Sequence, residues 1–338
     1  AQTSNIISVT NRVDNVDGIV LSNVNQYCPT RCDMADNEVK CEWKWKSAER
    51  RPIIVINNKL LHPKPNQVYR YSVNRDDTDL TLICKGNGNH FMNFGQQTIT
   101  ARCYGDGKFY VTDFENGFPD EGHRVEDMEC ENKIHADITP FPDDPLICKG
   151  YLLKIGFNDV QPFHELIKVC FERNLQKTIW TKHTIQGKSL LAGDNRPDTK
   201  FNFGPMPFFT PGDQSYFTVN LPTLYKSFPY ITRLGLEDFA IKCSESLRLD
   251  KGHMAPSGDF VTSTEKQASF YYINSFPQWS TINQGNWLKV EFSVQNLAKH
   301  LGEDLEIITG GLEVLKDIYL KSDPNKVPVP DFTWKIIF

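Results

Sequence analysis

The chain has 338 residues, of which 39% are hydrophobic, so it is long enough to bury one large or two smaller cores. Its formal net charge of −5 argues against a protein that coats nucleic acid over its whole surface, and no apolar run reaches the length of a membrane span. Nine cysteines without paired zinc-type spacings favour an oxidising compartment, and because nine is odd, at least one is free or pairs between chains.

The first 130 residues are predicted to form β structure. Residues 1–66 are polar and interrupted by prolines, so we expect loops and short strands there, held by a disulfide from the cluster Cys28, Cys32 and Cys41. The strands expected next, separated by turn signals, cover 68–73, 80–84, 98–103 and 108–111. This pattern predicts a small antiparallel β domain, in which the lone His90 and His123 are structural or incidental.

The proline-rich segment 140–145 is the expected linker, because prolines stiffen it and no periodicity crosses it. We therefore expect a cysteine-containing β domain at 1–145 and a second domain at 146–338. Residues 1–150 carry 17 Lys and Arg against 22 Asp and Glu, a net charge of −5, whereas residues 151–338 carry 20 of each. The second domain is therefore neutral, which predicts modest non-specific affinity for nucleic acid and marked salt sensitivity.

The second domain is predicted to mix strands and helices. The elements expected are strands at 151–157, 165–171 and 178–184, a polar loop at 194–200, helices after Pro222 and around 236–246, and strands at 304–311 and 332–338. The strands at 165–171 and 178–184 flank a turn and form a hairpin. Its histidines, His164 and His183, are expected to be structural.

The stretch 249–291 carries the candidate chemistry. His253 follows a short alternating piece at 247–249 and is expected where a strand turns. The aromatic and β-branched residues 268–274, which end at Asn274, are predicted to form a second strand.

A helix is predicted near 283–300, with Asn283 as its N-cap, because apolar residues recur there at helical spacing. Glu291 follows Asn283 by eight residues, which is roughly 80° further round the helix at about 100° per residue, so both can face one site. The order strand, strand, helix therefore brings His253, Asn283 and Glu291 together.

These three residue types suit metal-assisted phosphodiester hydrolysis. A histidine with a pKa near neutrality can take a proton from an attacking water. An asparagine carbonyl is a hard oxygen ligand for Mg²⁺, and a glutamate farther out can hold the ion's waters. Each residue also has a structural interpretation: an ordinary histidine at His253, a simple N-cap at Asn283 and a solvated helix-face carboxylate at Glu291.

The motifs DKGHMAP, YYINSFPQ and INQGNWLKVE together resemble the signature of the DNA/RNA non-specific endonucleases, the ββα-metal nucleases. That family has Asp-Arg-Gly-His, then Asn-x-x-Pro-Gln, then Asn-Gln-x-x-Trp and Glu, in this order. The resemblance implies that His253 is the general base, Asn283 the only direct protein ligand of the metal, and Glu291 the organiser of its waters. Asn274 is implied to support the active-site loop or to bind a phosphate.

The resemblance also implies contacts with the substrate. Lys251 stands where the family usually has Arg; a lysine keeps the charge but loses the planar fork that holds a phosphate by two hydrogen bonds. We place Lys251 among the catalytic and the substrate-binding residues, and Gln278 among the latter. The family's phosphate-binding arginine corresponds to Arg196, the only arginine of its loop, with Lys200 as the alternative and a plain surface charge as the structural interpretation.

We therefore expect an α+β protein with an N-terminal antiparallel β domain and a ββα-metal nuclease domain built on a mostly antiparallel sheet. The hairpin around residues 164–185 resembles that of crustacean nucleases that favour double-stranded DNA. This resemblance implies double-stranded DNA as substrate, Mg²⁺ as cofactor with Mn²⁺ as a substitute, and products ending in 5′-phosphate. The alternatives are a nuclease that cuts double-stranded RNA or both sugars, and an inactive relative that binds nucleic acid or glycans.

The location and assembly state complete the expectations. The start at Ala1 rather than Met fits a mature form after signal-peptide removal, which together with the cysteines predicts a secreted, extracellular protein. A monomer with neither a membrane nor a protein partner is expected.

Overall fold

A computed structural model describes residues 5–10, 40–45, 50–65, 67, 70–74, 79–86, 88–92, 94–103, 109–111, 124–142, 144–158, 160, 163–202, 204, 249–315, 319–322 and 325–338. Cys28, Cys32, His123 and the helices expected within 214–246 lie outside these residues.

The larger sheet has seven strands, and every neighbouring pair is antiparallel. From edge to edge its strands are β1 (Asn5–Thr10), β18 (Phe332–Ile337), β15 (Asp304–Leu312), β12 (Lys177–Gln186), β11 (His164–Glu172), β10 (Tyr151–Phe157) and β9 (Asp137–Pro140). The expected strands at 151–157, 304–311 and 332–338 and the expected hairpin are confirmed. The mostly antiparallel α+β class is confirmed with them.

Strands β1 and β9 come from the N-terminal side of the expected boundary at residue 145. β1 pairs with β18 at one edge of the sheet, and β9 pairs with β10 at the other. The large sheet therefore uses chain segments from both sides of the predicted linker, and the division at 145 stays a prediction.

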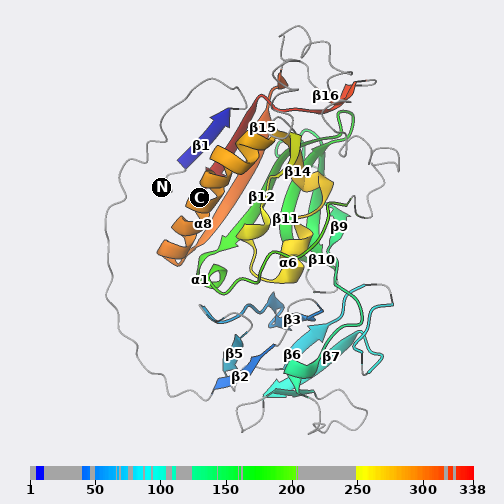
Figure 1. Ribbon diagram of the computed structural model, residues 1–338. Helices are drawn as coiled ribbons and strands as arrows, with labels where there is room; N and C mark the ends of the chain where they lie inside the picture. Colours follow the sequence, from blue (N-terminus) through cyan, green and yellow to red (C-terminus); the bar gives the residue numbers. More distant parts are fainter. Residues whose placement is uncertain are drawn as a thin grey trace.

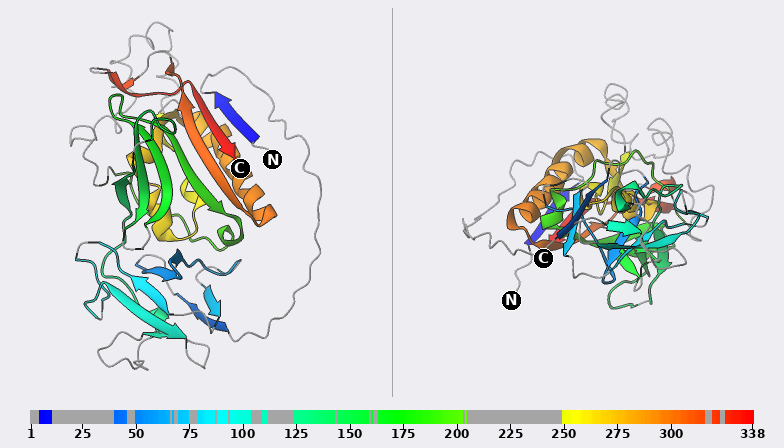
Figure 2. Two further views of the ribbon diagram at one scale, coloured as in Figure 1. Left: turned by 180° about the vertical axis from the view of Figure 1, so that it is seen from behind. Right: turned by 90° about the horizontal axis from the view of Figure 1, so that it is seen from below.

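One face of this sheet carries the helices and the antiparallel strand pair β13 (Leu249–His253) and β14 (Ser275–Trp279) (Figure 1). Helix α8 (Leu288–Leu301) buries Val290, Val294 and Ala298, which recur every four residues and so share one side of the helix. They pack against a cluster that includes Ile185 and Ile307 of the sheet. Seen from behind, the strands of the sheet face the viewer (Figure 2).

Strands β2 to β8, called here the N-terminal strands, lie beyond one end of the large sheet (Figures 1 and 2). They form a five-stranded antiparallel sheet and a separate pair: β4 (Lys59–Leu60), β3 (Ile53–Ile56), β6 (Leu80–Ile83), β7 (Thr98–Cys103) and β8 (Phe109–Val111), with β2 (Lys40–Lys44) beside β5 (Arg70–Asn74). The strands expected in this region are confirmed, with shifts of at most two residues at their ends. Disulfides join Cys84 to Cys130 and Cys148 to Cys170, and Cys41 is also disulfide-bonded.

The N-terminal strands and the large sheet share one core. A single cluster of buried apolar residues includes Trp43 and Phe109 from the first part and Ile167 and Ile273 from the second. A continuous core of this kind joins the two parts by the burial of apolar surface.

The segment before the catalytic helix differs from the expectation. Residues 268–274 are not a strand: they contain the end of helix α6 (Ser263–Ala268) and the 3₁₀ turn Tyr272–Asn274. A capping box starts α6, because Thr262 accepts from the Glu265 amide and the Glu265 carboxylate accepts from the Thr262 amide. The second strand of the hairpin is instead β14 (Ser275–Trp279).

The expected helix near 283–300 is confirmed as α8, but Asn283 is not an N-cap. Helical backbone begins earlier, in α7 (Ser280–Ile282), and includes Asn283, but it is interrupted at Gly285, whose φ of −105° and ψ of −107° mark a kink in the π-type turn Asn283–Trp287. Among the described residues, no helix combines the length and apolar character needed to cross a membrane. The remaining short elements are the 3₁₀ turns Val125–Asp127 and Ser257–Asp259, helix α1 (Gly187–Leu190), and strands β13 (Leu249–His253), β16 (Tyr319–Ser322) and β17 (Asn325–Pro328).

A buried ion pair between the two parts predicts how stability depends on pH. His62 Nε2 lies 2.7 Å from Glu265 Oε1, and the side chains are 9% and 4% exposed. Burial lowers the pKa of His62, but the Glu265 carboxylate more than offsets this, so the pKa lies above its ordinary 6.5. Burial likewise opposes ionisation of Glu265, but His62 and the Thr262 amide lower its pKa from 4.5 to about 2.

The raised pKa of His62 stabilises the fold below pH 6.5 and loses this effect as pH rises through the folded-state pKa. The lowered pKa of Glu265 stabilises the fold above pH 4.5 and loses this effect as pH falls towards 2. His62→Ala should therefore reduce the free energy of unfolding most between these limits, by about 3 kcal/mol. Urea denaturation across pH measures this, with His90→Ala, at an exposed pair with Glu131, as the control. A deficit that does not vary with pH would contradict the assignment.

Candidate active site

A strand pair and the following helix form a ββα unit at the centre of the site. β13 pairs antiparallel with β14, and His253, the last residue of β13, is opposite Ser275. Asn283 lies in the π-type turn before α8, and Glu291 lies in the first turn of α8. The three residues singled out by the motifs thus come from the end of a strand, a turn and the start of a helix.

His253 is partly exposed and lies among aromatic rings. Its ring centroid is 4.7 Å from that of Phe201 and 4.8 Å from that of Phe270, which it meets edge-on. Burial, and then the positive charge of Arg196, lower the pKa of His253 from 6.5 to about 3, so the imidazole is neutral at pH 7. Its Nε2 is buried and has no hydrogen-bond partner within the described part of the chain. A neutral imidazole with an open nitrogen can accept a proton.

Asn274 is fully buried and holds the loop that follows His253. Its Oδ1 accepts from the Ala255 amide at 2.9 Å, and its Nδ2 donates to the carbonyls of Ala255 and Ser269, both at 2.8 Å. Its own carbonyl accepts from the Met254 amide at 3.0 Å. The side chain is 0% exposed, so of the two roles expected for it this conformation suits loop support and not a phosphate contact.

The side-chain amide of Asn283 is oriented by Asp250. Asn283 Nδ2 donates to Asp250 Oδ2 at 3.1 Å, and Gln284 Nε2 donates to the same oxygen at 2.9 Å. The side-chain nitrogen is thereby engaged, which leaves the side-chain oxygen of Asn283 as the atom that could accept a further contact. The kink at Gly285 interrupts the helix between Asn283 and α8. The sequence interpretation included Asp250 in a motif but gave it no role.

The charge of the buried Lys335 acts on Glu291. Burial raises the pKa of Glu291 to about 8, and the positive charge of Lys335 opposes this shift. Lys335 is 1% exposed on β18, and its Nζ donates to Thr309 Oγ1 at 2.7 Å and to the Met254 carbonyl at 3.4 Å. Sequence reasoning missed Lys335, although one signal was available: it occupies an inward position of an alternating strand, where unpaired lysines are rare.

Asp259, His183 and Gln295 form a second cluster of polar side chains near the site. Asp259 Oδ2 is 2.8 Å from His183 Nε2, and Asp259 Oδ1 accepts from Gln295 Nε2 at 2.9 Å. His183 is 3% exposed, and burial lowers its pKa. Asp259 influences the pKa values of both His253 and Glu291, which places it within electrostatic range of the two. His183 therefore has the structural position expected for it.

The two expected cations border the aromatic rings around His253. The Arg196 guanidinium carbon is 5.0 Å from the Phe270 ring centroid, and Arg196 is exposed. Lys251 Nζ lies 5.7 Å from the ring centroid of Phe201 and 5.8 Å from that of Tyr272. Cations at these distances from ring faces are held by the ring quadrupole. Lys200, the alternative to Arg196, is also exposed.

Gln278 does not lie on the surface as a substrate contact requires. It is 0% exposed, and a Cβ added to Gly252 would come within 2.8 Å of its Oε1. The side chain therefore packs behind β13, and in this conformation it cannot touch a substrate. The expectation for Gln278 fails because the Pro-Gln end of the motif lies on β14, whose residues here are buried.

Among the described residues, no three His, Cys, Asp or Glu side chains converge to hold a metal ion. A site built on one asparagine oxygen needs a cation that keeps most of its waters, as Mg²⁺ does. An asparagine oxygen at Asn283, with a carboxyl group at Glu291 in the helix that follows, is a donor set that suits such an ion.

An antiparallel α+β fold that contains this ββα unit has the architecture of the ββα-metal class of proteins. Residues 149–338 match the model of the DNA/RNA non-specific endonuclease family. The chain belongs to that family, as the motifs predicted.

Curated relatives extend the similarity into the N-terminal part. A salivary endonuclease of Lutzomyia longipalpis is 30% identical over 258 residues, which is 72% of this chain and 58% of that protein. The salivary protein Tsal1 of Glossina morsitans morsitans is 21% identical over 310 residues, 86% of this chain and 72% of that protein. A salivary endonuclease of Culex quinquefasciatus is 31% identical over 91 residues, 26% of this chain and 25% of that protein. The alignment thus spans little more than half of the Lutzomyia relative.

Proposed function

We propose that this protein is a metal-dependent endonuclease that hydrolyses phosphodiester bonds, with His253 as the general base. The observation that carries the proposal is a neutral imidazole at the end of β13, whose Nε2 has no hydrogen-bond partner among the described residues. A base must be unprotonated at the working pH, as the His253 imidazole is, although its pKa of about 3 lies below the near-neutral value expected from the sequence and makes it a weaker proton acceptor. The contacts with Phe201 and Phe270 fix the ring plane and so the direction in which the proton is accepted.

In this proposal a water molecule attacks the phosphorus in line, and His253 takes its proton. Asn283 would hold a Mg²⁺ ion, or Mn²⁺ in its place, through its side-chain oxygen, and Glu291 would hold the ion's waters by hydrogen bonds. The ion supplies charge neutralisation at the phosphate and at the departing 3′ oxygen, so the products end in 5′-phosphate. Asp250 orients Asn283, and Asn274 keeps the loop after His253 in place.

Arg196 and Lys251 are the cations proposed to hold the scissile phosphate. Both lie on the aromatic cluster next to His253, and Arg196 is close enough to lower the pKa of His253. Phosphate contacts made by Lys and Arg position a nucleic acid without reading its sequence. This arrangement suits a nuclease without sequence preference.

We also propose that the protein is secreted and monomeric. The disulfides Cys84–Cys130 and Cys148–Cys170 support an oxidising, extracellular location. Two of the relatives are salivary endonucleases by name, which agrees with release from a cell.

The first test removes the base. His253→Ala should lower kcat on plasmid DNA by about 10²–10⁴-fold, the usual effect of losing a general base, while leaving the melting temperature and DNA binding in EDTA nearly unchanged. His300→Ala, an exposed histidine at the end of α8, is the matched control and should retain full activity. A loss of less than tenfold for His253→Ala would mean that another group takes the proton.

The second test removes the proposed ligand. Asn283→Ala should abolish tight Mg²⁺ binding measured by calorimetry, because in this proposal its side-chain oxygen is the one direct protein ligand of the ion. Asn296→Ala, an exposed asparagine on the same helix, should bind Mg²⁺ like the parent. If Asn283→Ala bound Mg²⁺ as tightly as the parent, the ion would be held elsewhere.

The third test concerns the substrate, for which we propose double-stranded DNA. A-form RNA differs from B-DNA in groove shape and carries 2′-hydroxyls, and a single strand lacks two phosphate backbones at fixed spacing. Lys251 in place of Arg and the neutral second part of the chain leave little spare affinity for a poorly fitting substrate. Initial rates on matched duplex DNA, single-stranded DNA and duplex RNA should therefore favour duplex DNA, and more strongly at higher salt. Comparable rates on all three would refute this preference while leaving the nuclease proposal intact.

A further inference from the structure

The segment 194–202 forms a strap that crosses the site and is tied at both ends. At its far end Asn202 donates from its amide to the Phe270 carbonyl at 3.0 Å and accepts from the Tyr272 amide at 2.9 Å. Between the ends the strap presents Arg196 over the Phe270 ring and Phe201 against His253. The position of Arg196 therefore depends on how firmly the two ends are held.

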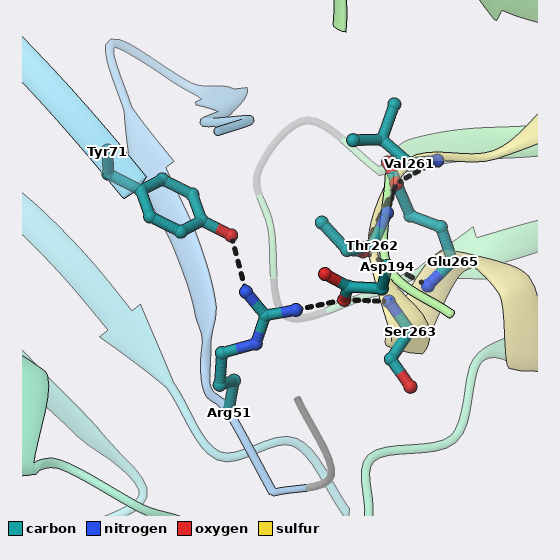
Figure 3. A network of polar contacts seen from close by, with 7 residues as sticks. All are labelled: Arg51, Tyr71, Asp194, Val261, Thr262, Ser263 and Glu265. Atoms are coloured by element: carbon teal, nitrogen blue, oxygen red, sulfur yellow. Dashed lines mark hydrogen bonds and ion pairs between the residues drawn. The ribbon is translucent and has the colours of Figure 1, made fainter. Parts of the chain in front are cut away.

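The near end of the strap is Asp194, which is held by three groups (Figure 3). Its amide donates to the Val261 carbonyl at 2.8 Å, and its Oδ2 accepts from the Ser263 amide at 2.6 Å. The same oxygen pairs with Arg51 Nη2, and Arg51 Nη1 donates to the Tyr71 hydroxyl at 3.0 Å. The Arg51 and Asp194 side chains are 5% and 0% exposed.

Arg51 and Tyr71 belong to the N-terminal part of the chain. Arg51 stands just before β3, Tyr71 lies on β5, and Arg51 is 143 residues away from Asp194 in the sequence. The Tyr71 ring is stacked on Trp43 at 5.2 Å between centroids, and Trp43 belongs to the shared apolar core. Tyr71 is thus packed against the shared core, and its hydroxyl holds the Arg51 guanidinium that pairs with Asp194.

The geometry of the pair indicates positioning rather than net stabilisation. Taking two charges out of water costs free energy that their mutual attraction only partly returns, so a buried pair is weak evidence of stability. The planar guanidinium spans two fixed partners at once, which the single ammonium group of a lysine does not reproduce. A guanidinium that contacts two partners in this way fixes the position of Asp194. It thereby also fixes the position of Arg196, which follows two residues later in the chain.

We propose that the N-terminal β structure is a positioning element of the nuclease site. Arg51 acts through Asp194 to hold the strap 194–202, and the strap holds Arg196 beside His253 for contact with a substrate phosphate. The inference rests on the proposed nuclease function and on the phosphate role of Arg196. Arg51 is a positioning residue, since the chain from Arg51 to the site runs through Asp194.

The test is a double-mutant cycle between Arg51→Met and Arg196→Ala in the full chain, with kcat and KM measured on duplex DNA. Misplacing the strap should raise KM about tenfold with kcat changed far less, because phosphate contact is lost while His253 stays in place. In the Arg196→Ala background, Arg51→Met should add little further increase in KM, since both substitutions remove the same contact. Arg50→Met, at a half-exposed pair with Glu129, is the matched control and should leave KM unchanged.

Further variants keep the result decisive if Arg51→Met unfolds. Arg51→Lys retains the charge beside Asp194 but not the fork, and Tyr71→Phe retains the stacked ring but not the hydroxyl; each should raise KM in the same direction by a smaller factor. A folded Arg51 variant with the parent KM, or effects that add fully in the double variant, would overturn the proposal. An inactive parent protein would instead refute the nuclease function itself, which separates the two failures.

Discussion

The site depends on one buried amide, the side chain of Asn274. It makes three hydrogen bonds to the backbone of Ala255 and Ser269, and its carbonyl receives the Met254 amide, so it joins the loop after His253 to the end of helix α6. A buried backbone group that loses its partner costs about 1–3 kcal/mol, so no other side chain could replace this amide without leaving donors or acceptors unpaired. The backbone that follows His253 is therefore held by a residue whose side chain is fully buried.

Burial above all keeps the proposed base His253 neutral, and cations lie close to it. Arg196 lowers the pKa of His253, and the buried Lys335 opposes the upward shift in the pKa of Glu291. The chain as a whole carries a net charge of −5, so the field that attracts a phosphate is local and comes from a few side chains. We therefore expect a substrate to be bound by a few positioned contacts more than by bulk charge, and we expect this binding to be sensitive to salt.

The sequence predicted the parts of the structure that local patterns determine. Alternating residues located most strands of both sheets but not β1, β9, β3 or β4, and three short motifs placed His253, Asn283 and Glu291 in the ββα unit. It failed where the tertiary structure decides: residues 268–274 have strand composition, but the capping box at Thr262 and Glu265 forms a helix just before them. Gln278 was expected at the substrate and is buried. Lys335 and Arg51 are connected to the site by contacts between residues far apart in the sequence, which no local pattern encodes.

The central claim is that this fold cleaves phosphodiester bonds with the help of a divalent cation. Incubation of the purified protein with supercoiled plasmid tests it most directly, with Mg²⁺ supplied in one reaction and excess EDTA in a parallel one. The account predicts conversion to open-circular and linear DNA with Mg²⁺ and intact plasmid with EDTA. Intact plasmid in both reactions, with the protein folded and bound to the DNA, would contradict it and indicate a protein that only binds nucleic acid.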